Sequence, residues 1–176
     1  DYDVAFKQLI QFANSNDAAT QFLIGEMYAK GQGTDINQAE AVKYMKQSAA
    51  QNFVLAERMM GEYHLEGKGV AEDYNQAIHW FEKAAQQNDG PSLYKLGLLF
   101  QNGLGAEKDT PKAVSYFLKA ADADDLDAQK MLGNIYLNGL GVDKDLAKGD
   151  AWLSKAADRG DAAAQYAIGF LYTGGD

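Results

Sequence analysis

The chain has 176 residues, 47% of them hydrophobic, so it carries enough apolar side chains to build a core and lacks the composition of a disordered chain. Its 16 Lys and Arg against 25 Asp and Glu give a net charge of −9, which disfavours binding to nucleic acid or to anionic membrane surfaces. No apolar run approaches the roughly 18 residues that membrane insertion of a helix requires, and the absence of cysteine excludes disulfides, thiolate metal sites and cysteine nucleophiles.

The first predicted element is a helix within residues 1–16. Ala5 and Ala13 lie 36 residues before Ala41 and Ala49, which recur at the same place in the repeats that follow. This leading helix therefore aligns with the second helix of a repeat.

A 36-residue repeat follows, which we divide into residues 17–52, 53–88, 89–124 and 125–160, with a partial repeat at 161–176. Apolar residues spaced by three and four predict two helices in each repeat. One glycine recurs in the middle of the first helix, and a Gly-x-Gly pair starts six residues after it. The mid-helix glycines are Gly25, Gly61, Gly97, Gly133 and Gly169, and the pairs start at Gly31, Gly67, Gly103, Gly139 and, by the same spacing, Gly175.

Aspartate or asparagine is expected to begin almost every helix, because its side chain accepts hydrogen bonds from the free amides of the first turn. The predicted caps are Asp17, Asp89, Asp125 and Asp161 for the first helices and Asn37, Asp73, Asp109 and Asp145 for the second, with Phe53 replacing the acid in one repeat. Asn37 with Glu40, and Asp73 with Gln76, resemble a reciprocal capping box. The Gly-x-Gly pairs suit a turn between helices that needs positive φ.

Two series of large rings also follow the period. The first lies on the second helix, and we predict that it packs against the mid-helix glycine, because close packing would offset the low helix propensity of glycine. Its members are Tyr44, Trp80, Tyr116 and Trp152. The second series is predicted to fill the space between successive repeats, and consists of Tyr28, His64, Phe100, Tyr136 and Tyr172. We interpret both series as core.

The motif Leu132-Gly133-x-x-Tyr136-x-x-Gly139-x-Gly141-Val142, followed by Asp145, Trp152 and Lys155-Ala156-Ala157, resembles the Sel-1-like repeat, a relative of the tetratricopeptide repeat. The resemblance covers essentially the whole chain. It implies an all-α fold, a right-handed αα superhelix of about four to five helix-turn-helix repeats, whose members mostly act as scaffolds or adaptors for other proteins.

Both ends of the chain add expectations. The opening Asp-Tyr-x-x-Ala is similar to the leading helix of exported bacterial family members just after their signal peptide, which implies a periplasmic or exported protein whose signal peptide is absent from this chain. The other end stops at Gly174-Gly175-Asp176, inside a predicted turn. We therefore expect the chain to be a segment of a longer protein.

The first helix of each repeat commonly lines the concave side of such a solenoid, so its outward positions are where a partner would bind. Positions three before and one after the mid-helix glycine share one helical face. They mix rings with single charges and differ between repeats, and rings and arginine are common anchors of interfaces. The predicted partner-binding residues are Phe22, Arg58, Tyr94, Lys130 and Tyr166 at the first position and Glu26, Glu62, Leu98, Asn134 and Phe170 at the second.

No catalytic residue, metal site or cofactor is predicted. His64 and His79 have no partner at metal-ligand spacing. The run Asp122, Asp124, Asp125 and Asp127 lacks the glycine and glutamate of a calcium loop, and we interpret it as a solvated turn with a helix cap.

The sequence thus favours a protein-protein interaction module that holds a peptide or protein in its concave groove. Three alternatives stay open. The first concerns the role of the binder: the resemblance allows a regulator of an envelope system, a host-contact factor or an immunity-type inhibitor of a secreted toxin. The second is an enzyme acting on β-lactams or the cell wall, as linked to cysteine-rich family members whose cysteines this chain lacks. The third is a structural spacer on whose surface the variable residues have merely drifted.

Overall fold

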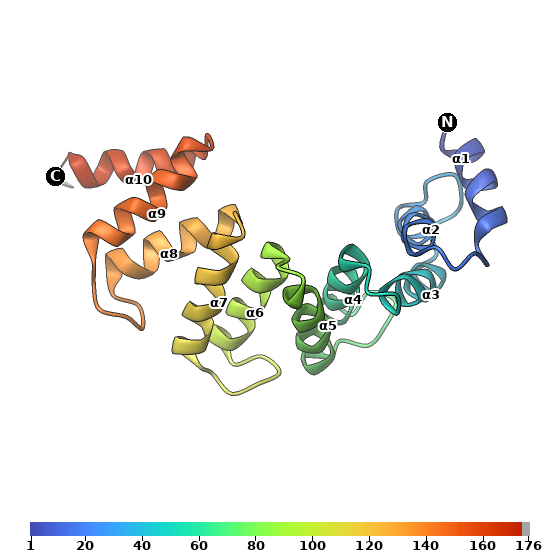
Figure 1. Ribbon diagram of the computed structural model, residues 1–176, viewed down its shortest axis with the longest axis horizontal. Helices are drawn as coiled ribbons and strands as arrows, with labels where there is room; N and C mark the ends of the chain where they lie inside the picture. The colour runs from blue at the N-terminus through green and yellow to red at the C-terminus, as the bar shows by residue number, and fades with distance from the viewer. Residues whose placement is uncertain (174–176) are drawn as a thin grey trace. The chain divides into compact units, whose positions relative to one another are not determined.

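The computed structural model describes residues 1–173, and across these residues the chain is all helical, with no strand (Figure 1). The leading helix α1 (Tyr2–Leu9) continues into a 3-10 helix at Ile10–Phe12. The first helices of the repeats are α2 (Ala18–Lys30), α4 (Val54–Glu66), α6 (Gly90–Asn102), α8 (Leu126–Asn138) and α10 (Ala162–Tyr172). The second helices are α3 (Gln38–Ala49), α5 (Tyr74–Gln86), α7 (Thr110–Asp122) and α9 (Leu146–Asp158). The predicted turn at Gly174-Gly175-Asp176 lies outside the described residues.

The helices form two compact units, residues 1–87 with α1 to α5 and residues 88–176 with α6 to α10. Within each unit the two helices of a repeat pack on each other, and the second helix also packs on the first helix of the next repeat. This pattern of neighbours is consistent with a helical solenoid.

All eight predicted Asp and Asn caps accept a hydrogen bond from a first-turn amide, at 2.8 Å for Asp17 and 3.1 Å for Asn37. Phe53 makes no such bond. The predicted return bond of the capping box, from the backbone amide of Asn37 to the Glu40 side chain, is wrong. The backbone amide of Asn37 donates to the Tyr28 carbonyl instead, at 3.0 Å, and the Glu40 carboxylate pairs with Lys43. The cap amide thus joins the second helix back to the first.

The Gly-x-Gly turns have the predicted positive φ. Gly67, for example, ends α4 at φ 67°. The second glycine of the pair also approaches the preceding repeat, since a Cβ on Gly69 would lie 2.7 Å from the Gln38 carbonyl oxygen. Glycine is therefore required here both by the backbone conformation and by the space.

The mid-helix glycines pack against the second helix, but not against the predicted rings. A Cβ on Gly61 would lie 2.6 Å from the Phe81 ring, and one on Gly133 would lie 2.6 Å from Leu153. Gly25 faces Met45 and Gly97 faces Phe117. The contacting side chain is thus the residue after each predicted ring, which points about 100° further round the helix.

Of the four rings predicted to face the glycines, Tyr44 is buried in the core as predicted, and the other three are less buried. Trp80, Tyr116 and Trp152 are half-buried. Lysine ammonium groups lie over them, with Lys155 Nζ at 4.0 Å from the Trp152 ring centroid. Such contacts use the apolar body of a ring without burying it fully.

The second ring series was predicted to be core, which is wrong for Tyr172, a residue that is 75% exposed. The other members pack in more than one way. The Tyr28 ring meets Phe6 of α1 edge-on at 5.2 Å, between successive elements as predicted, and stacks on Tyr44 at 5.8 Å. Phe100 instead stacks on Tyr116 of its own repeat at 5.6 Å.

Gly61→Ala is expected to lower the free energy of unfolding by about 1–3 kcal/mol, because the added Cβ overpacks the contact with Phe81. Gly169→Ala is the matched control, since a Cβ there meets no atom within 4 Å outside its own helix backbone among residues 1–173. It should stabilise α10 by up to about 1 kcal/mol through helix propensity alone. Urea unfolding followed by circular dichroism measures both, and equal effects of the two substitutions would contradict the close packing.

Candidate partner-binding face

Ten predicted residues lie on the first helices, and we call them the first-helix face. The five residues that lie three positions before the mid-helix glycine do not all point into solvent. In unit 1, Phe22 is only 9% exposed and its ring lies 5.4 Å from that of Phe53, the residue that replaces a cap acid. Phe22 therefore belongs to the core. Arg58 is half-buried.

In unit 2 the same position again reaches the cap of the next first helix. Lys130 Nζ lies 2.9 Å from Asp127 and 3.2 Å from Asp161, the N-cap of α10. The Tyr94 ring lies 5.6 Å from Phe117; burial raises its pKa, and the charges of Asp127 and Asp125 add to the shift. Part of the variation at this position is therefore structural, since Phe22 and Lys130 each match the cap that they meet.

Tyr166 differs from the other four, because it is 77% exposed and no helix of the described chain covers it.

The residues one after the glycine are more open. Glu26 pairs with Lys30 at 2.6 Å, and Glu62 and Leu98 are half-buried. Asn134 is exposed, and Phe170 is 54% exposed. The face is thus acidic in unit 1 and mixed apolar and polar in unit 2.

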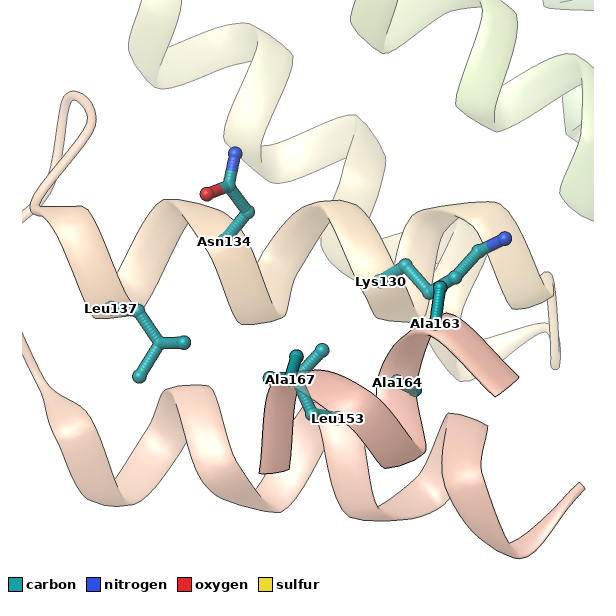
Figure 2. Close-up of a pocket in the computed structure, with 7 residues that line it drawn as sticks. All are labelled: Lys130, Asn134, Leu137, Leu153, Ala163, Ala164 and Ala167. Atoms are coloured by element: carbon teal, nitrogen blue, oxygen red, sulfur yellow. The ribbon is translucent and has the colours of Figure 1, made fainter. Parts of the chain in front are cut away.

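Two adjoining hollows lie on this face in unit 2. One, of about 220 Å³, lies among α8, α9 and α10, and Figure 2 shows Leu137 pointing into it while Asn134 turns its amide away. Its lining is Lys130, Asn134, Leu137, Leu153, Ala163, Ala164 and Ala167. The second, of about 420 Å³, shares Leu137 and Ala167 with the first and includes Tyr166 and Phe170. The hollows thus bring together four residues predicted from the sequence.

Short side chains open the first hollow. At the register of Ala163 and Ala167, helix α4 carries Leu55 and Met59, and both pack on the core of unit 1. Sequence reasoning missed the two alanines, because it searched for rings and charges. The signal that could have found them is a pair of alanines four residues apart, on one helical face, where another repeat carries larger residues.

Other chemistry-bearing residues have structural surroundings. His79 is exposed, with its ring 5.6 Å from Trp80, and His64 is half-buried. In the acidic run, Asp125 caps α8 as predicted. Within residues 1–173, no three His, Cys, Asp or Glu side chains are placed to share a metal ion, and no helix combines the length and apolar character needed to cross a bilayer.

The family model of the Sel1 repeat matches the chain four times, at residues 18–53, 54–89, 90–125 and 126–161. The chain belongs to the Sel1 repeat family. Members of this family generally serve as scaffolds for protein-protein interaction and are generally not enzymes. No curated protein matches the chain.

Solved bacterial structures agree with this assignment. A protective antigen of uropathogenic Escherichia coli with the same fold is 31% identical, with a TM-score of 0.93 over 99% of this chain and 38% of its own. A Sel1 repeat protein of Oxalobacter formigenes is 35% identical, with a TM-score of 0.88 over 97% of this chain and 71% of its own. Cysteine rich protein B of Helicobacter pylori, 24% identical with a TM-score of 0.60 over 75% of this chain and 98% of its own, shares the fold. This chain thus spans well under half the length of the Escherichia coli protein.

The caps of α8 and α10 should respond in opposite ways to loss of charge. The amide of Ala164, and then Lys130, hold the pKa of Asp161 below 3.8, so its ionised form stabilises the fold at neutral pH. Burial raises the pKa of Asp125, so its ionised form destabilises the fold at neutral pH. Because asparagine caps as well as aspartate, Asp161→Asn should lower the melting temperature at pH 7 and Asp125→Asn should raise it.

Both differences in melting temperature between variant and wild type should disappear at acid pH. The Asp161 contribution is lost as the pH falls through its lowered folded pKa, and the Asp125 cost disappears as the pH falls through its raised one. Melting temperatures from pH 3 to 7 test this. A shift of the same sign for both variants at pH 7 would show that the environments of the two caps do not differ in this way.

Proposed function

We propose that this Sel1 repeat chain binds a segment of a partner protein on its first-helix face and takes an apolar side chain of that segment into the hollow beside Ala167. The observation that carries the proposal is the hollow itself, with an apolar lining of leucine and alanine and with Lys130 and Asn134 at its edge (Figure 2). An apolar pocket with a few polar groups is the common form of an anchor site at protein interfaces.

Exposed rings beside the hollow support the same function. Tyr166 and Phe170 line the adjoining hollow and present large apolar surfaces to solvent. Aromatic residues are enriched in interfaces, where they bury large areas. Burial of one leucine-sized side chain contributes about 1.5–3 kcal/mol, and contacts with the flanking rings would add to this anchor.

The charge state of Lys130 favours binding over covalent chemistry at this place. Hydrogen bonds to Asp127 and Asp161 raise the pKa of the Lys130 ammonium, which stays protonated at neutral pH. A protonated amine is neither a nucleophile nor a general base. This lysine therefore does not support the hypothesis of an enzyme that acts on β-lactams or the cell wall. An inhibitor of a secreted toxin would be one special case of a protein binder.

Ala167→Met should fill the hollow, because Met59 occupies the same register in α4. We expect at least about a fivefold loss of partner capture, which corresponds to about 1 kcal/mol, with folding retained. Tagged wild-type and variant chains are incubated with an extract of the bacterium that encodes them, and retained proteins are quantified by mass spectrometry.

Ala39→Met, at an exposed position of α3, is the matched control and should leave capture unchanged. Tyr166→Ala with Phe170→Ala should also reduce capture without changing the melting temperature, since both side chains are exposed. Retention of the same proteins by Ala167→Met and by the double variant would reject the proposal and favour a structural spacer.

A further inference from the structure

Tyr63 places a polar group at a core position of α4. The residues at the same register of α2, α6 and α8, namely Met27, Leu99 and Ile135, are buried and carry no hydroxyl. Tyr63 is 3% exposed, and its hydroxyl is buried without a hydrogen-bond partner. Such a group destabilises the folded chain, so packing alone gives no reason for a tyrosine here.

Two carboxylates of the first-helix face act electrostatically on this hydroxyl. Glu26 of α2 and Glu62 of α4 each follow the mid-helix glycine, at the same register of successive first helices. Burial raises the pKa of Tyr63 to about 12, and the negative charges of Glu26 and then Glu62 contribute. The hydroxyl therefore remains protonated at neutral pH and lies in the field of both carboxylates. We call Glu26, Glu62 and Tyr63 the acidic junction.

The acidic junction can rearrange at little cost. Glu26 is bound to Lys30 of its own helix at 2.6 Å, in a pair whose side chains are 28% and 55% exposed. An exposed ion pair between residues four apart contributes little to stability. A cation from outside can therefore replace Lys30 at Glu26, and its contact with the buried Tyr63 hydroxyl requires the side chains around that hydroxyl to move. Glu62 has interactions of its own as well.

We propose that the acidic junction binds an arginine side chain of the partner protein. The guanidinium has five N–H donors in one plane and a permanent charge, so it can donate to Glu26 and Glu62 together. The Tyr63 hydroxyl oxygen can accept a further N–H, which would give that group a hydrogen-bond partner. The inference rests on the proposed function, because it names the partner chemistry of the first-helix face within residues 1–87.

Titration of the full chain with the peptide acetyl-Gly-Arg-Gly-amide tests the proposal, followed by the backbone amide signals of Glu26, Glu62 and Tyr63 in NMR spectra. We expect saturable shifts at these three amides. The same peptide with citrulline, which is neutral and close in shape, should cause none, and the lysine peptide should bind several-fold more weakly because it lacks the planar fork. Absence of shifts, or equal binding of the citrulline or lysine peptide, would overturn the assignment.

Tyr63→Phe separates a binding role from a structural one. It should weaken the arginine peptide about fivefold, as expected for one lost hydrogen bond, and raise the melting temperature, because it removes a buried hydroxyl that has no partner. Tyr74→Phe is the control: its hydroxyl bonds to Glu72, outside the acidic junction, and its loss should leave the affinity unchanged. Unchanged affinity in Tyr63→Phe would refute the role of the hydroxyl.

Glu26→Gln and Glu62→Gln should each weaken the arginine peptide about tenfold or more, since each removes a charged acceptor. If these variants bind the arginine peptide as wild type does, the proposal fails. That failure would leave the test of the hollow beside Ala167 untouched, because the substitutions lie in different units and use different probes.

Discussion

The rest of the structure depends on the close approach of two helices at a glycine. Where Gly61 meets Phe81, the absence of a Cβ lets a bulky side chain lie against bare backbone. The same contact occurs at Gly25, Gly97 and Gly133 with other large side chains. Because interiors pack densely, this contact sets how the two helices of a repeat lie, and with them the direction of every residue counted from the glycine.

Most of the fold could be predicted from the sequence, because period, caps and turns depend on local chemistry. Asp17 and its counterparts cap helices wherever they stand, and Gly67 takes a conformation that few other residues accept. The partner of the glycine could not be predicted in this way. Trp80 and Phe81 are both large, and a repeat period alone does not say which of two neighbours faces inward.

The residues of the candidate site could be predicted where a side chain carries a charge, an amide or a ring, but not where a short side chain leaves space. Lys130, Asn134, Tyr166 and Phe170 carry charge, amide or rings and were found by position. The space that joins them exists because Ala163 and Ala167 are short, and a missing side chain has no chemical signature. Likewise, nothing local in the sequence shows that the Tyr63 hydroxyl is left without a partner, because that depends on its three-dimensional surroundings.

The contact between Phe22 and Phe53, set beside that between Lys130 and Asp161, has a consequence for modularity. The repeats that bear Phe22 and Lys130 each carry a residue suited to the opening residue of the next repeat: ring against ring in the first case, and cation against acid in the second. Recombination that moved the repeat bearing Phe22 ahead of the one that opens with Asp161 would set a hydrocarbon ring against a carboxylate that now binds the Lys130 ammonium. These two repeats are therefore not interchangeable, because each is matched to the repeat that follows it.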